Sequence, residues 1–470
     1  MKNAVFVIAI GKYSRIFISL IINIILSRLL TPEDYGVVAV VTVFTTFFAS
    51  LSDMGLSAAV IQIKELSKKD IDSIFSFSVY YALLLAMIFI FLSGFIADFY
   101  GSLIYKKVCI LLSIALLFEA LNTVPNGIMN RKKKFKEISM RIVLTYIFSA
   151  FIAIILAFLG WKYYALVMQS IITAIITFLW NYKTTRPKFH FSFSLKSIDK
   201  IKKYSSFQFA FNILVYFSRN LDNLLTGKFM GSTELGFYNK AYTLMLYPVN
   251  NITNVIAPVL HPVLSDYQNK KNTIYISFVN LTRILFLIGT IISGICIIAS
   301  SELIILAFGN QWFQSIDCFK VLSIAIVFQM INGTTGAIYQ SLGNTKQLFL
   351  NGAVNSVITI VAIFIGIFIG KDIYLLALAV ALAYVVQCLI SFSLLIHFGF
   401  QYKIKKFFFS LRKEIGFLII IAISIVCWRW TIPNMWISLI IKSSYILMIS
   451  LAYLLISKEY IFVLKMIKKK

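Results

Sequence analysis

The sequence predicts an all-α, polytopic membrane protein with about 14 transmembrane helices. We expect two six-helix lobes in parallel repeat, followed by two peripheral C-terminal helices. The 470 residues are 60% hydrophobic and only 13% charged, whereas a soluble domain carries about 25% charged residues. Apolar stretches of about 20 residues, the length that crosses a bilayer, recur from one end to the other. A motif near the N-terminus also returns 200 residues later, as in an internal repeat.

Short polar or basic segments separate the apolar stretches, so that 14 spans can be drawn. The N-terminal stretch is longer than a signal-peptide core and has no small-residue cleavage site, and we interpret it as the first span. The predicted spans are residues 5–30, 37–62, 73–97, 107–129, 138–159, 163–181, 206–228, 241–265, 274–299, 317–341, 347–369, 373–397, 415–431 and 435–456.

The net charge of +26 is distributed unevenly between the two sets of loops. With the N-terminus inside, the segments on that side hold about 29 Lys and Arg, and the opposite loops hold about 7. This asymmetry predicts that both termini are cytoplasmic. Lysines in short loops also contact anionic membrane lipid, so the charge does not call for a nucleic-acid partner. The richest segments are 131–136, 182–204 and 403–413, and the second is expected to lie along the inner membrane surface.

The repeat aligns RLLTPEDYGV at residues 28–37 with KFMGSTELGF at residues 228–237. Each copy has a basic residue, two apolar residues, a short polar turn, an acid (Asp34 or Glu234) and a glycine (Gly36 or Gly236). Six spans separate the copies, so both point the same way across the membrane. Such repeats are related by an axis along the membrane normal and enclose a cavity.

This pattern predicts four parts of the chain. Residues 1–182 form an N-terminal six-helix lobe, 183–205 a cytoplasmic inter-lobe loop, 206–400 a C-terminal six-helix lobe, and 401–470 two additional helices with a basic cytoplasmic tail. The segment Leu303–Trp312 is too short to span and is expected in the outer interface, with Trp312 as its anchor.

Signatures of catalysis and metal binding are nearly absent from the sequence. The three histidines lie far apart near predicted membrane surfaces, and the five cysteines are scattered without paired spacing. Histidines in such places are typical of the membrane interface, and the cysteines are typical of small buried side chains. We therefore expect no catalytic residue, no metal and no cofactor.

Charged residues inside the spans are the main candidates for function, because a charge in hydrocarbon is unfavourable unless it faces protein or water. Ser19 is the repeat-mate of Arg219, and Arg15 lies one helical turn before Ser19. On the two-lobe interpretation Arg15 and Arg219 point into the central cavity, and Arg283 could join them. Arginine suits bidentate contact with phosphate or carboxylate, so the cavity is a candidate site for an anionic substrate.

Other interpretations of these charges stay open. Asp222 lies three residues after Arg219, so the pair could neutralise itself or contact substrate together. Arg141, near the cytoplasmic end of its span, could face the cavity or only snorkel. Asp53 and Glu119 have no basic neighbour in sequence, and they could be proton- or cation-coupling sites or hydrogen-bonded structural acids.

Several motifs resemble the Wzx-type polysaccharide-transport flippase family of the MOP (MATE-like) exporter superfamily. SRLLTPEDYGVVAV and LSDMGLSAAVIQ are similar to its first-helix hairpin, and RNLDNLLTGKFMGSTELGFYNKAYTLMLYPVNNI with APVLHPVLSDYQ is similar to its seventh- and eighth-span signature. FGNQW resembles its short segment before span ten. The likeness covers spans one to twelve. The basic run 131–136 matches no motif of the family, and Val215 lacks the charge of its repeat-mate Arg15.

The resemblance implies a two-lobed transporter of the bacterial inner membrane that works by alternating access. Its implied substrate is an undecaprenyl-diphosphate-linked oligosaccharide, moved to the outer leaflet for capsule, O-antigen or exopolysaccharide assembly. A polymerase and a chain-length regulator of the same pathway are possible partners.

Two alternatives belong to other classes of protein. A cation-coupled multidrug exporter of the MATE type would want an acidic, aromatic cavity, whereas the strongest inward charges here are arginines. A membrane polymerase or ligase would need a large external loop, and no predicted external loop exceeds roughly 20 residues.

Overall fold

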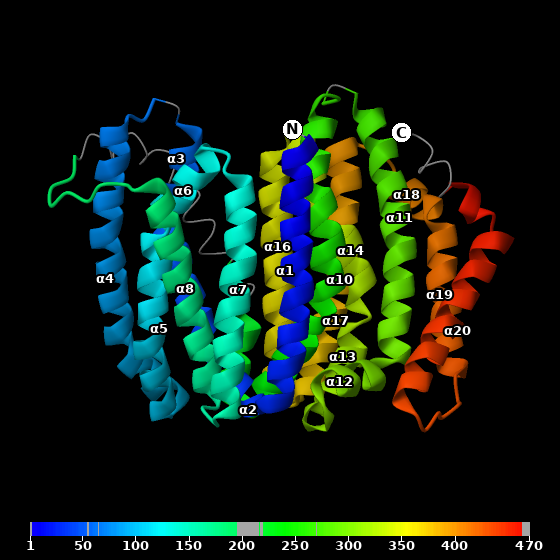
Figure 1. Cartoon of the computed structure of the whole chain (residues 1–470). Coiled ribbons are helices and arrows are strands. Elements are labelled where there is room, and N and C mark those ends of the chain that lie inside the picture. The colour runs from blue at the N-terminus through cyan, green and yellow to red at the C-terminus, as the bar shows by residue number, and fades with distance from the viewer. Residues whose placement is uncertain are drawn as a thin grey trace. The chain divides into compact units, whose positions relative to one another are not determined.

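A computed structural model of the chain describes residues 2–53, 56–63, 65–194, 216, 220–268 and 270–462 (Figure 1). Every regular element in these residues is a helix, which confirms the predicted all-α class. The chain falls into two compact units, Met1–Gly236 and Phe237–Lys470. The four parts predicted from the sequence are not tested by this division and stay a prediction.

Nine helices of the described residues are long and apolar enough to cross a membrane. The pair Ser315–Leu322 and Ala325–Ser341, bent by 46°, would be a tenth span. Hydrocarbon cannot satisfy an exposed peptide group, so helices are the form in which such a chain crosses it. The polytopic membrane character is therefore confirmed, while the count of 14 spans stays a prediction.

The first unit is built around long helices, some of which pack on the next helix in the chain and others on a helix far from them in sequence. Figure 1 shows α4 and α5 side by side, and α1 packs on α7, which packs on α8. A capping box of Ser67 and Asp70 begins α4, and Gly101, in the left-handed region at φ 72°, turns the chain into α5. The helices are α1 (Lys2–Leu29), α2 (Pro32–Asp53), α3 (Leu56–Gln62), α4 (Lys68–Tyr100), α5 (Leu103–Leu121), α6 (Thr123–Arg131), α7 (Phe135–Phe158) and α8 (Tyr163–Thr185).

Asp34, the acid of the first repeat copy, is buried at the start of α2. Its carboxylate accepts hydrogen bonds from the Thr31 amide (3.0 Å) and the Thr31 hydroxyl (2.8 Å), while the Asp34 amide donates to that hydroxyl. This is a capping box for α2. The other carboxylate oxygen accepts from the Tyr163 amide at 2.9 Å. One acidic side chain therefore starts α2 and ties the beginning of α8 to it.

The two repeat copies contact each other through their glycines within the first unit. A Cβ added to Gly36 would collide with the carbonyl oxygen of Ser232, and a Cβ added to Gly236 would collide with that of Pro32. Because Ser232 and Pro32 are themselves repeat-mates, the contact is reciprocal. Glycine allows helices to approach this closely. The repeat seen in the sequence therefore makes a two-fold backbone contact, which explains the glycine in both copies.

The helix α10 (Ser232–Ser265) leads into the second unit. Figure 1 shows α11, α19 and α20 next to one another, and α11 packs on α14, and α16 on α17. The other elements are α11 (Lys271–Ile298), α12 (Ser300–Phe308), η1 (Asn310–Trp312), α13 (Ser315–Leu322), α14 (Ala325–Asn332), α15 (Thr335–Ser341), α16 (Thr345–Phe364), η2 (Ile365–Gly370), α17 (Ile373–Leu394), η3 (Leu395–Phe400), α18 (Ile404–Ser410), α19 (Arg412–Cys427) and α20 (Met435–Ile456).

Buried ion pairs attach the last two helices to the rest of the second unit. Arg283 of α11 contacts Glu414 of α19 at 2.5 Å and Glu459, after α20, at 2.6 Å. The side chains of both glutamates are almost fully buried, at 0% and 3% exposure. A second pair joins Lys442 of α20 to Glu302 of α12 at 2.6 Å. Helices α19 and α20 are thus fixed by charge at two places, which their apolar sequences do not indicate.

The expectation that Trp312 anchors an interfacial segment is wrong. Its indole is 0% exposed and packs edge-on against Phe237 and Phe308. The ammonium of Lys240, itself buried, lies 4.4 Å from the ring centroid of Phe308 and 4.9 Å from that of Trp312. A cation over two aromatic faces is stabilised by their quadrupoles. Trp312 therefore belongs to a buried aromatic cluster, because a partner 72 residues away in sequence covers it.

Replacing either repeat glycine by alanine should destabilise the protein, because the new Cβ meets a backbone oxygen. We expect Gly36→Ala and Gly236→Ala each to lower the free energy of unfolding by about 1–3 kcal/mol, as overpacking does. Thermal unfolding of the purified protein in detergent measures the change.

Gly94→Ala is the matched control, because nothing lies within 4 Å of a Cβ at this position inside α4. Alanine there should be neutral or slightly stabilising. Equal melting temperatures for the three variants would show that the glycine contact does not form.

Removing the Arg283 guanidinium should be severely destabilising, because it leaves the buried Glu414 without its counter-charge and leaves Glu459 with Lys413 alone, at 2.8 Å. We expect Arg283→Met to cost about 3–5 kcal/mol, measured by thermal unfolding. The exposed Arg429 offers the control Arg429→Met, which should change little. Adding Glu414→Gln and Glu459→Gln to Arg283→Met should recover part of the loss. If Arg283→Met melts with the control, the two ion pairs do not hold α19 and α20.

Candidate functional site

The stretch around Asp222 has two different faces. Residues 220–229 are helical, and Asp222 and Thr226, four residues apart, share one face. They are 4% and 0% exposed. The Asp222 carboxylate accepts a hydrogen bond from the Asn223 amide at 2.8 Å. A carboxylate this buried does not face lipid, as expected of a charge inside a span, which faces protein or water.

The structure describes only some of the arginines that are predicted to line the cavity. Arg219 lies outside the described residues. Arg15 lies in α1, but its side chain is outside the described part. Arg141, in α7, is 5% exposed. The arrangement of Arg15 opposite Arg219 therefore stays a prediction, as does the choice between self-pairing and substrate contact for Arg219 and Asp222.

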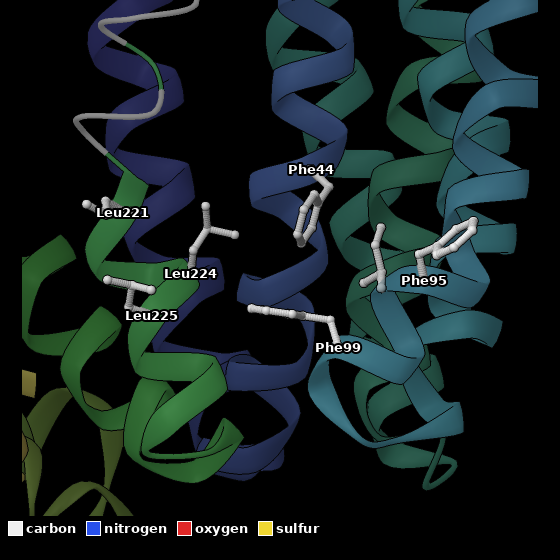
Figure 2. A pocket seen from close by; sticks show the side chains of 7 residues that line it. Phe44, Phe95, Phe99, Leu221, Leu224 and Leu225 are labelled. Atoms are coloured by element: carbon white, nitrogen blue, oxygen red, sulfur yellow. The ribbon is translucent and has the colours of Figure 1, made fainter. Parts of the chain in front are cut away.

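The opposite face of residues 220–229 lines an apolar pocket of about 340 Å³ (Figure 2). Figure 2 shows leucine side chains from this segment facing phenylalanines from α2 and α4 across the opening. Phe95 and Phe99 are 72% and 48% exposed, so the pocket opens on the outside of the chain. The lining is Phe44, Phe95, Ile96, Phe99, Leu221, Leu224 and Leu225. A pocket of this size and character suits part of an apolar chain.

Polar contacts hold Tyr216 and residues 220–230 against α2 and α4. The Tyr100 hydroxyl donates to the carbonyl of Leu224 at 3.1 Å, and the Tyr216 hydroxyl donates to the carbonyl of Val43. The Lys228 ammonium donates to the carbonyl of Phe99 and lies 4.8 Å from the centroid of its ring. Because Phe99 also lines the apolar pocket, the Lys228 ammonium lies at the edge of this pocket.

Asp53 and Glu119, the residues predicted for coupling, lie at the same end of the first unit. Each is in the last turns of its helix, α2 or α5, and these two helices pack together. Both side chains are exposed. One carboxylate oxygen of Asp53 accepts a hydrogen bond from the Ser57 amide at 3.3 Å. A coupling role for Asp53 and Glu119 stays a prediction.

Arg283 belongs to the ion-pair network of α11, α19 and the residues after α20. Its guanidinium contacts two carboxylates and lies 4.0 Å from the ring centroid of Phe462. These contacts favour a structural role in the second unit, and contact of Arg283 with substrate stays a prediction.

Sequence reasoning missed the apolar pocket and the cation at its edge. The phenylalanines that line the pocket are indistinguishable in sequence from others in the same spans, since apolar residues fill every face of a lipid-facing helix. Within the described residues, no group of three His, Cys, Asp or Glu side chains could hold a metal ion.

Comparison with known proteins places this geometry in a family. Residues 25–317 match the model of a family described as polysaccharide biosynthesis proteins. The teichuronic acid biosynthesis protein TuaB of Bacillus subtilis is 22% identical over 387 residues, covering 81% of this chain and 79% of TuaB. The lipopolysaccharide biosynthesis protein WzxC of Escherichia coli K12 is 23% identical over 376 residues, covering 76% and 74%.

Among solved structures, the lipid II flippase MurJ in an inward closed conformation is similar in fold. Its TM-score is 0.73 at 16% identity, and the match covers 97% of this chain and 100% of MurJ. The fold is therefore that of MurJ, as the resemblance to the flippase superfamily predicts. Because the family match spans well over half of the 470 residues, the chain belongs to the family of polysaccharide biosynthesis proteins.

Proposed function

We propose that the protein is a flippase for a lipid-linked oligosaccharide, with undecaprenyl diphosphate as the lipid carrier. It moves the repeat unit from the cytoplasmic to the outer leaflet of the bacterial cytoplasmic membrane, for assembly of a surface polysaccharide. The observation that carries the proposal is the match to a lipid II flippase over 97% of the chain in a member of a polysaccharide biosynthesis family. Such neighbours fit a transporter rather than an enzyme.

The physical problem of this transport is the charge of the diphosphate. Moving an anion through hydrocarbon is unfavourable unless cations accompany it, and arginine contacts phosphate through two parallel hydrogen bonds. We assign this role to Arg15 and Arg219, with Asp222 orienting Arg219. The polyprenyl chain stays in the bilayer during the passage. The apolar pocket, with Lys228 at its edge, is a place where part of the chain could rest.

Orientation and partners follow from the same proposal. Both termini lie in the cytoplasm, since the basic loops are on their side. Movement occurs by alternating access between two lobes, and Asp53 and Glu119 are candidates for coupling to an ion. A polymerase and a chain-length regulator would act on the delivered repeat units.

Removing either cavity arginine should abolish most transport. We expect Arg219→Ala and Arg15→Ala each to reduce flipping about 10- to 100-fold, because a charged hydrogen bond contributes about 1.5–3 kcal/mol. The measurement is translocation of a polyprenyl-diphosphate oligosaccharide in proteoliposomes, with surface polysaccharide of a complemented deletion strain as the cellular readout. Arg429→Ala is the control with the same loss of charge at an exposed site. Normal transport by Arg219→Ala at normal protein level would sink its assigned role.

A double-mutant cycle separates the two interpretations of Asp222. If Asp222 only orients Arg219, Asp222→Ala should slow flipping at least tenfold in the parent but change little when Arg219→Ala is already present. If Asp222 acts on the substrate independently, the two losses should multiply. Flipping rates of the four proteins in the proteoliposome assay decide, and multiplied losses would exclude the orienting role.

A further inference from the structure

Each unit carries a basic groove where the chain leaves a long helix. The first basic groove follows α8 and has a volume of about 690 Å³. Its charged or titratable lining residues are Lys183, Arg186, Lys188 and His190, and its aromatic ones are Tyr182 and Phe189. The three cations are exposed, and no carboxylate is among the described residues that line it.

The backbone of this groove is held rigidly on α4. The Lys188 amide donates to the Asp72 carboxylate at 2.8 Å, the His190 amide to the Ser76 hydroxyl at 2.9 Å, and the Ser194 amide to the Ser73 hydroxyl at 2.7 Å. All three acceptors belong to buried residues of α4. Arg186, in the left-handed region at φ 48°, makes the bend that lets the chain turn back. The groove is therefore built by tertiary contacts.

Aromatic residues alternate with the polar ones along this segment. Phe189 and Phe193 each contact the ring of Tyr80 of α4, with centroids 5.8 and 6.0 Å apart. The Tyr80 hydroxyl donates to the carbonyl of Phe191 at 3.0 Å, while the Phe191 side chain is 90% exposed. An extended segment places alternate side chains on opposite sides. Aromatic side chains next to cations are typical of the membrane interface.

The second unit has an equivalent groove, which follows η3 and has a volume of about 790 Å³. Its lining includes Lys403, Lys405 and His397, the aromatic Phe398 and Tyr402, and Gln347. Again no carboxylate is among the described lining residues.

The two grooves are built in the same way. Gln401, at φ 60°, ends its helix in the left-handed region as Arg186 does. Tyr402 packs edge-on against Tyr275 of α11, with centroids 4.6 Å apart, as Phe189 packs on Tyr80 of α4. In the predicted order of spans, α4 is the third span of its lobe and α11 the third of the other. Two copies of one construction, in halves whose sequences differ at these positions, indicate that the groove is a feature of the repeated unit.

We propose that each basic groove binds the headgroup of an anionic phospholipid of the bilayer. The cations match the phosphate charge, and Phe191 and its neighbours enter the acyl-chain region beside it. A free anion would not need these exposed aromatic residues. Binding at two equivalent places anchors both units at the membrane face that carries the basic loops, and it does not depend on the transported substrate.

The test measures lipid preference on the full-length protein in phosphatidylcholine bilayers. A trace of spin-labelled phosphatidylglycerol or of spin-labelled phosphatidylcholine is added, and the motionally restricted fraction gives the relative association constant. The parent should prefer phosphatidylglycerol. Each removed cation should reduce the preference at its own groove by up to about fivefold. The variants Lys183→Gln/Arg186→Gln/Lys188→Gln and Lys403→Gln/Lys405→Gln should therefore each lower the measured preference, and the five changes together should lower it most.

The control is the variant Lys132→Gln/Lys133→Gln/Lys136→Gln, which removes three cations that line neither groove. Because these lysines line neither groove, it should lower the preference less than either groove variant does. An equal loss in this control would overturn the proposal in favour of general surface charge. So would displacement of the labelled lipid by millimolar inorganic phosphate, or restriction of labelled polyprenyl phosphate but not of phosphatidylglycerol. If the first-groove variant melts lower than the parent, the single change Arg186→Gln replaces it, and Lys405→Gln replaces a destabilised second-groove variant.

Discussion

A hydrocarbon layer solvates neither a free peptide group nor an isolated charge, and most features of this protein answer that constraint. The chain crosses as helices because helices satisfy their own backbone. Several charges inside the described part of the chain are paired or covered: Arg283 by two glutamates, Glu302 by Lys442, and Lys240 by two aromatic rings. The remaining positive charge gathers in loops at the membrane face, where water and phosphate are available.

The contact between the two copies of the repeat explains why the motif contains a glycine. Gly36 lies against the backbone of Ser232 and Gly236 lies against the backbone of Pro32, and Ser232 and Pro32 are repeat-mates. Asp34 then fixes the first copy by starting α2 and holding the beginning of α8. The same short motif therefore supplies a helix start, a link between spans and a close crossing, which accounts for its acid and its glycine together.

Function in a transporter of this kind requires two different environments for one substrate. The diphosphate needs cations, which we place at Arg15 and Arg219, and the polyprenyl chain needs apolar surface. Residues 220–229 have a polar and an apolar side, because Asp222 is buried on one face while three leucines line the apolar pocket on another (Figure 2). The basic grooves add a separate contact with the bilayer that does not involve the transported molecule.

The sequence by itself determined the all-helical membrane class, the repeat and the family, because each depends on local properties. The free energy of placing a 20-residue segment in hydrocarbon is a sum over its own residues, and a gapless motif needs no knowledge of neighbours. It also indicated that Asp222 faces protein or water rather than lipid. The tertiary structure decided the partners of charges: Glu414 lies 131 residues from Arg283, and Lys240 covers Trp312, which sequence reasoning wrongly placed in the interface. Those contacts depend on which spans pack together, and the sequences of uniformly apolar helices do not indicate which helices are neighbours.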